Sequence, residues 1–130
     1  SMGKYNINEI ITEFCGDKSI SVGENSIFLA KKVYSKFSDI GLATKDGSYS
    51  AVDFIDIHKT KYCIAAYNKK QEFTGGKIEV NRINCTNYSE EKFIDNISIY
   101  EAKNKNLTEK SEYLTGNEKE VIVNTPIQYD

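Results

Sequence analysis

The sequence predicts an α+β fold in two layers, with an antiparallel meander of strands packed against helices. Residues 49–83 contain three runs rich in β-branched and aromatic residues, separated by turn residues, which is typical of a strand meander. Apolar residues at helical spacing occur on both sides of these runs. The expected order is α-α-β-β-β-α-β in a single domain over residues 1–130, of which Ser1 and Met2 resemble a vector remnant.

Two helices are predicted before the meander. Residues 6–15 place isoleucines and a phenylalanine at i, i+3, i+4 and i+7, which is one helical face, and Gly16 is a stop signal. Residues 25–40 carry a second apolar stripe, and Gly41 is expected to end that helix. Each helix would bury its stripe against one face of the sheet.

The meander itself is expected to consist of strands at residues 49–58, 61–67 and 77–83. The first two carry apolar side chains on both faces, so both are predicted to be covered on both sides. The third alternates more cleanly, with Ile78 and Val80 facing inward. We therefore expect it to be an outer strand with one wet side, and a candidate edge for a homodimer.

A third helix is predicted from about residue 87 to about residue 103, because two glutamates stand in its first turn, where the helix dipole favours them. Phe93 belongs to its expected buried stripe. A short last strand is predicted at residues 120–124, and Pro126 closes it. No internal repeat and no interdomain linker is recognised.

Composition favours a small globular protein in the cytoplasm. The formal net charge is -2 and Arg82 is the single arginine, which is not the basic, arginine-rich character of a nucleic-acid binder. No apolar run is long enough to span a membrane and no signal peptide opens the chain, so no membrane partner is expected. Cys15, Cys63 and Cys85 lack metal-ligand spacing and are predicted to be buried free thiols in a reducing compartment. No metal or cofactor is expected.

No catalytic residue is assigned from the sequence. His58 is the single histidine, and Asp56 stands two residues before it on the same strand face, but no nucleophile motif accompanies them. The order helix, three strands, helix, strand resembles the core of the PD-(D/E)xK nucleases, for which Asp53 and Asp56 would supply the first acid. The acid two residues before Lys69 that this motif requires is missing, so such a nuclease would have a degenerate motif.

The sequence favours a binding function, most of all that of an immunity-type inhibitor that captures a toxin or a nuclease. Residues 87–130 hold nine acids against five lysines, whereas residues 1–86 hold twelve bases against ten acids. An acidic end can steer association with a basic enzyme surface. The candidate contacts with the protein partner are Glu109, Glu112, Tyr113, Glu118 and Glu120.

The alternative binding function is that of a small-molecule-binding domain. Its pocket is expected between the second helix and the meander, where aromatic side chains are available as a lining. The candidate ligand contacts are Phe54, Tyr62 and Tyr67.

Overall fold

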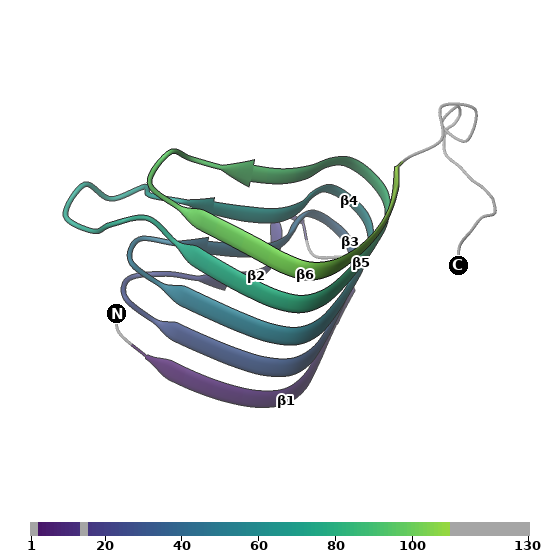
Figure 1. Ribbon diagram of the computed structural model, residues 1–130, viewed down its shortest axis with the longest axis horizontal. Helices are drawn as coiled ribbons and strands as arrows, with labels where there is room; N and C mark the ends of the chain where they lie inside the picture. Colours follow the sequence, from purple (N-terminus) through teal and green to yellow (C-terminus); the bar gives the residue numbers. More distant parts are fainter. Residues whose placement is uncertain (1–2, 14–15, 110–130) are drawn as a thin grey trace.

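The computed structural model describes residues 3–13 and 16–109, and these residues form a β-solenoid. The strands are β1 (Lys4–Glu13), β2 (Lys18–Val22), β3 (Ile27–Lys45), β4 (Tyr49–Tyr67), β5 (Lys77–Ile94) and β6 (Ile99–Glu109). Each strand pairs in parallel with the strand of the next coil, as Figure 1 shows. The predicted α+β class is therefore wrong, since the described residues contain no helix and no antiparallel pair.

The coil of the solenoid is an internal repeat that was not recognised in the sequence. Equivalent residues of successive coils have a sequence separation of 22. Examples are the hydrogen-bonded pairs Ser26–Ser48 and Gly76–Ser98, which lie just before the strands begin. The separation is one residue longer between β1 and β3, and six residues longer between β4 and β5. We number the positions of a coil from 1 at the first paired residue, and register partners share a position. The residues at position 1 are Lys4, Ile27, Tyr49, Lys77 and Ile99.

Each coil folds into two walls joined by a corner (Figure 1). The corner lies at position 11, where the backbone takes positive φ angles of 61° at Phe37, 65° at Lys59 and 59° at Asn87. Positions 1–10 form the first wall, and positions 12–19 form the second. The long strands β3, β4 and β5 run through the corner and contribute to both walls. The predicted break between residues 58 and 61 is this corner.

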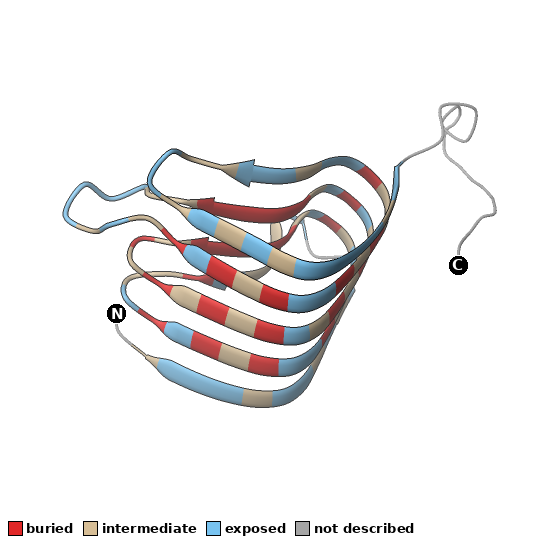
Figure 2. Ribbon diagram, in the orientation of Figure 1, coloured by how far each residue is buried: buried red, intermediate tan, exposed pale blue. Residues whose placement is uncertain are grey.

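The first wall has an unusual alternation that explains the wrong helices. Positions 2, 4, 7 and 9 face inward, and positions 5 and 6 both face outward, as the bands of buried residues in Figure 2 show. The residues at position 7, Val33, Ile55 and Ile83, are fully buried. Because two inward positions are three residues apart, the wall imitates the i, i+3 spacing of a helix. The predicted helices are therefore wrong, because the described residues of these segments lie mainly in strands. The segments are residues 6–15, 25–40 and 87–103.

The interior is closed by pairs of matched side chains between position 15 of one coil and position 9 of the next. Two cysteines form a disulfide with a Cα–Cα distance of 6.3 Å, two serines hydrogen-bond to each other, and a glycine accommodates an isoleucine. These pairs are Cys63–Cys85, Ser19–Ser35 and Gly41–Ile57. The prediction of free thiols is wrong for Cys63 and Cys85, and Cys15 lies outside the described residues. Gly41 ends no helix; it lies within β3, where a larger side chain would meet Ile57.

The strand order β1-β3-β4-β5-β6 leaves β1 and β6 as the edges of the first wall, and β2, which pairs only with β3, is an edge of the second wall. Residues 77–83 belong to β5, which pairs with β4 on one side and β6 on the other. The prediction that this segment is an outer strand is therefore wrong, and it offers no free edge to a second copy. Figure 2 shows that β1 and β6 are more exposed than the strands between them.

Candidate binding surface on the outside of the solenoid

The coil formed by β4 ends in an insertion that breaks the regular repeat. The sequence separation of register partners rises here to 28, as between His58 and Thr86, and the additional length lies in residues 68–76 between β4 and β5. This segment, which we call the insertion loop, projects from one end of the walls in Figure 1. Its residues 69–72 are exposed. Insertions into repeats commonly lie on the binding face, so the loop is the first candidate site.

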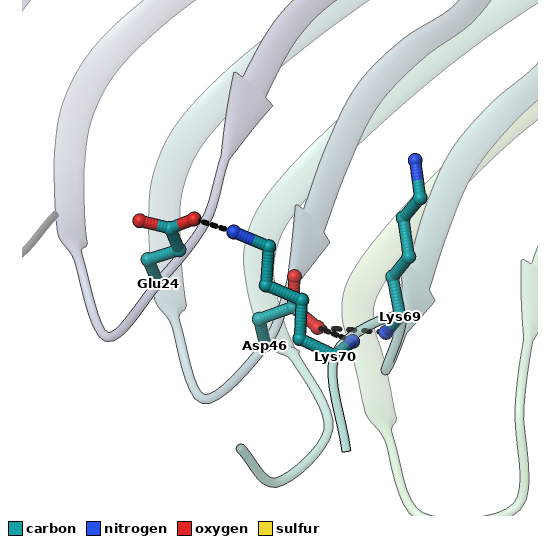
Figure 3. A network of polar contacts seen from close by, with 4 residues as sticks. All are labelled: Glu24, Asp46, Lys69 and Lys70. Carbon is teal, nitrogen blue, oxygen red and sulfur yellow. Dashed lines mark hydrogen bonds and ion pairs between the residues drawn. The ribbon is translucent and has the colours of Figure 1, made fainter. Parts of the chain in front are cut away.

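A buried carboxylate holds the base of the insertion loop (Figure 3). Asp46 has no exposed surface, and its Oδ1 accepts hydrogen bonds from the backbone N–H of Lys69 at 2.7 Å and of Lys70 at 2.9 Å. Its Oδ2 has no hydrogen-bond partner among the described residues. Asp46 and Gly47 take positive φ angles, which turns the chain sharply beneath the loop. The carboxylate thus fixes two loop amides from the neighbouring coil.

An ion pair crosses two coils at the same place. Lys70 Nζ donates to a carboxylate oxygen of Glu24, as Figure 3 shows. This hydrogen bond is the largest of the causes that lower the pKa of Glu24 to about 2, and it raises the pKa of Lys70. The side chains of Lys70 and Glu24 are 47% and 33% exposed, so the pair orients the loop more than it stabilises the fold.

The side-chain and backbone amides of Asn68 hold the remainder of the loop. Asn68 Nδ2 donates to the carbonyl oxygens of Phe73 at 2.6 Å and of Thr74 at 2.7 Å, and the Asn68 backbone N–H donates to Asp95 Oδ2 at 2.7 Å. Gly76 lies so close to the chain that an added Cβ would be 2.0 Å from the carbonyl oxygen of Thr44. The loop is therefore preformed, which reduces the entropy that binding would cost.

Beside the loop, three aromatic rings gather on the outer face of the second wall. The ring centroid of Phe93 lies 6.0 Å from that of Tyr62 and 6.1 Å from that of Tyr67. Phe93 is 51% exposed, although it is a large apolar side chain. We call Tyr62, Tyr67 and Phe93 the ring cluster. It adjoins the insertion loop, because Asn68 follows Tyr67 directly and hydrogen-bonds to Asp95.

Two alanines share the column of Phe93 on the second wall. Ala43, Ala65 and Phe93 are successive register partners at position 17, on the outer side of the wall. Both alanines are fully buried, although neither belongs to the cluster of apolar side chains that forms the interior of the solenoid. Position 17 of the second wall is therefore apolar in three successive coils, and its phenylalanine is the exposed member.

Two lysines lie near the tyrosines of the ring cluster. Lys61 Nζ lies 5.7 Å from the ring centroid of Tyr62, within cation–π range. Burial raises the pKa of Tyr67, and the nearby Lys18 acts in the opposite direction. Lys18 in turn forms an ion pair of 2.5 Å with Asp17. With the loop lysines, these groups give the surface an apolar centre and a charged rim, which is the usual arrangement of a protein interface.

The structure brings only two of the three predicted ligand contacts together. Tyr62 and Tyr67 meet through Phe93. Phe54 lies on the first wall, where its ring contacts Tyr34 at 6.1 Å and Arg82 at 5.0 Å. The pocket expected between a helix and a meander does not exist, because the helix does not form. Phe93 is a site residue that the sequence did not reveal, because helical spacing placed this ring in a predicted buried stripe.

The predicted partner contacts lie mostly outside the described residues. Glu109 is exposed at the end of β6, and nothing is described for Glu112, Tyr113, Glu118 and Glu120. The described residues carry 15 lysines and arginines against 15 aspartates and glutamates. The net charge of -2 of the whole chain therefore resides in residues 110–130, which hold two lysines and four acids.

His58 is engaged by its neighbours. Its Nδ1 lies 2.7 Å from Thr86 Oγ1, and its ring stands edge-on to Phe37 with 6.3 Å between centroids. Asp56 shares the outer face of the first wall with it, as predicted from the strand period. This is an ordinary setting for a half-buried imidazole between two coils. Asp53, the other predicted acid, accepts a hydrogen bond of 2.8 Å from Asn81 Nδ2.

The outer face of the first wall also contains an open groove of about 490 Å³. It runs across β1, β3, β4, β5 and β6, and Ala51 forms part of its floor. Its polar groups include both charges, and Tyr49 Oη donates a hydrogen bond of 2.5 Å to Glu79 Oε1 at its rim. The charged residues that line it are Lys31, Asp53, Glu79, Glu101 and Lys103.

Together the fold and these surfaces define a β-solenoid with an elaborated outer face. Compared with known proteins, the chain matches no family model, no curated protein and no solved structure. Among the described residues there is no group of three or more metal-ligand side chains. That part of the chain also contains no helix that could cross a membrane.

Proposed function

We propose that the protein is a binding module that captures a protein partner through the ring cluster and the insertion loop. The observation that carries this proposal is the exposure of Phe93, 51%, at the centre of a preformed surface. Exposed aromatic side chains are enriched at the centres of protein interfaces, and such anchors supply most of the binding free energy.

The arrangement of the rings favours a protein over a flat small molecule. The planes of Tyr62 and Tyr67 are inclined to that of Phe93 by 58° and 62°. Inclined rings present an uneven surface into which side chains can interdigitate, whereas a planar ligand requires a flat face for stacking. The lysines of the rim would complement acidic groups on the partner.

The inhibitor function remains a finer proposal within this class. It is supported by the excess of acid in residues 110–130, which would steer the chain toward a basic toxin or nuclease. In that case Glu109, Glu112, Glu118 and Glu120 accelerate association, and Tyr113 and the ring cluster hold the complex. Reversing the four glutamates to lysine would then slow association without changing the thermal unfolding temperature.

The test of the proposed site is capture of the partner by immobilised variants. The wild-type chain and Phe93→Ala are exposed to a lysate of the source cells, and bound proteins are identified by mass spectrometry. We expect Phe93→Ala to lose at least about tenfold of the captured partner, as for the loss of an interface anchor. Phe54→Ala removes a matched ring from the first wall and should capture normally. Equal capture by both variants would remove the ring cluster from consideration.

A small polar ligand is the second candidate, and the groove of the first wall favours it. Its volume of about 490 Å³ lies within the range of small-molecule sites, and both signs of charge line it. A ligand bound there should raise the unfolding temperature of the wild-type chain. The rise should disappear in Asp53→Ala and persist in Phe93→Ala, which separates this site from the ring cluster.

A further inference from the structure

The two edge strands of the first wall, β1 and β6, differ in the side chains that they direct inward. At the β6 edge, position 7 is occupied by Lys105, whereas the same column holds Val33, Ile55 and Ile83 in the inner coils. Lys105 Nζ lies 2.8 Å from a carboxylate oxygen of Glu91. A charged residue at an inward position is a known means of preventing another strand from adding to an edge.

The β1 edge lacks this obstruction. Its position 7 is Ile10, and Tyr5 and Ile7 occupy the inward positions 2 and 4. Tyr5 is 52% exposed, whereas Phe28, its register partner in β3, is 4% exposed. The apolar interior thus remains accessible at this edge, as the pale and tan β1 at the foot of Figure 2 shows. An accessible edge with apolar inward positions is suited to receive another strand.

The pattern of inward and outward positions along β1 is the same in both chain directions. The first wall faces inward at positions 2, 4, 7 and 9 and outward at the other six, so the pattern is symmetric about the midpoint between Asn8 and Glu9. A two-fold axis through this midpoint would place a second β1 antiparallel to the first. Inward residues then face inward residues, because opposed residues of an antiparallel pair share a face. Asn8 and Glu9, the two consecutive outward positions, then lie opposite the same two residues of the second copy.

The residues that this axis brings together are complementary. Ile7 of one copy faces Ile10 of the other, and Tyr5 faces Thr12, so the inner face remains largely apolar. Lys4 faces Glu13, which gives an ion pair at each end of the ladder. Each of these contacts occurs twice because the interface is isologous. In the single chain Glu13 also lies 3.9 Å from Lys36, its register partner in β3.

We propose that the chain forms a two-fold homodimer in which β1 pairs with β1 of a second copy, antiparallel and centred between Asn8 and Glu9. The dimer continues the first wall across both molecules and covers the apolar edge of each. The obstructed β6 edges then lie at the two far ends, so the assembly closes at two copies instead of growing into a filament.

Sedimentation velocity of the full chain over a range of concentrations tests this proposal. We expect a species of twice the chain mass of 14.7 kDa. Lys4→Glu and Glu13→Lys should each raise the dimer dissociation constant about tenfold, because two ion pairs become two repulsions. The double variant Lys4→Glu/Glu13→Lys exchanges the charges and should restore the wild-type constant. Ile10→Lys should abolish dimerisation by copying the obstruction seen at Lys105.

The charge variants keep the test decisive even if Ile10→Lys does not fold, since Lys4 and Glu13 are exposed. Lys103→Glu provides the matched control, because it reverses the same charge on β6. A single-chain mass at every concentration, or a charge exchange that fails to restore the dimer, would overturn the proposal. So would a dimer that Lys103→Glu weakens and Lys4→Glu does not, because the interface would then lie at the β6 edge.

Discussion

The inside and the outside of the coils formed by β4 and β5 differ in how completely the neighbouring coil covers their side chains. Inside, Cys63 is bonded to Cys85 and both are fully buried. Outside, on the same strands, Phe93 remains 51% exposed beside two tyrosines. Matched interior chemistry stabilises the coil stack, whereas an exposed ring contributes little to folding. Unmatched apolar surface on the outside is therefore the better guide to function.

The largest effect should follow loss of the interior disulfide. In the chain-entropy account, a cross-link between residues with a sequence separation of 22 stabilises the fold by about 3 kcal/mol. Cys63→Ala/Cys85→Ala should lower the free energy of unfolding by about this amount. Urea denaturation measures it, with wild-type chain in reducing buffer as a second route to the same state.

Counting thiols in the unfolded chain tests the disulfide directly. The chain has three cysteines, so one reactive thiol, that of Cys15, is expected without reductant. Three reactive thiols in protein purified under oxidising conditions would contradict the pairing. The result also bears on location, because disulfides persist mainly in oxidising compartments. The cytoplasmic location suggested by the sequence remains a prediction.

A smaller effect is expected from filling the interior at Gly41. An added Cβ would lie 2.7 Å from the carbonyl oxygen of Cys63 and 2.7 Å from Ile57 Cδ1. The carbonyl belongs to a strand paired on both sides, so it cannot move away freely. Gly41→Ala should therefore reduce the free energy of unfolding by about 2 kcal/mol, measured in urea.

Gly16→Ala is the matched control for this substitution. Gly16 is exposed and an added Cβ there would have no neighbour within 4 Å. Its unfolding curve should superimpose on that of the wild type. A similar loss in both variants would show that the cost arises from glycine replacement in general and not from the close approach at Gly41.

The sequence located strand-forming residues but not the way they assemble. Residues 49–58, 61–67 and 77–83 lie in β4 and β5 as predicted, but the pairing is parallel and not antiparallel. Parallel pairing in a solenoid depends on a repeat, and the coils conceal it because they differ in length, most of all where the insertion loop is added. The column of Val33, Ile55 and Ile83 reveals the repeat once the insertion loop is removed.

The candidate site could be predicted only in part for the same reason. Tyr62 and Tyr67 lie five residues apart on one strand, so a local pattern was sufficient to suggest them. Phe93 reaches them from the next coil, through a register that the insertion loop shifts by six residues. The role of Asp46 could not be predicted from a sequence motif either, because its hydrogen-bond partners are backbone amides of that loop.

The smallest effect should come from the exterior ion pair between Lys70 and Glu24. The pKa of Glu24 is lowered from its ordinary value of 4.5 to about 2, and the hydrogen bond from Lys70 is the largest cause. A lowered acid pKa stabilises the fold above pH 4.5, and this contribution is lost as the pH falls toward 2. Lys70→Met should return the pKa of Glu24 toward 4.5, as followed by NMR titration of the carboxylate.

Lys69→Met is the control for this titration, because it removes a neighbouring loop charge that forms no ion pair with Glu24 in Figure 3. Stability near neutral pH should change little in either variant, since exposed ion pairs contribute modestly. If Lys70→Met instead lowered stability as much as Gly41→Ala, the loop would be part of the structural framework. The insertion loop would then belong with the interior, which stabilises the fold, and not with the outer surface that is available for binding.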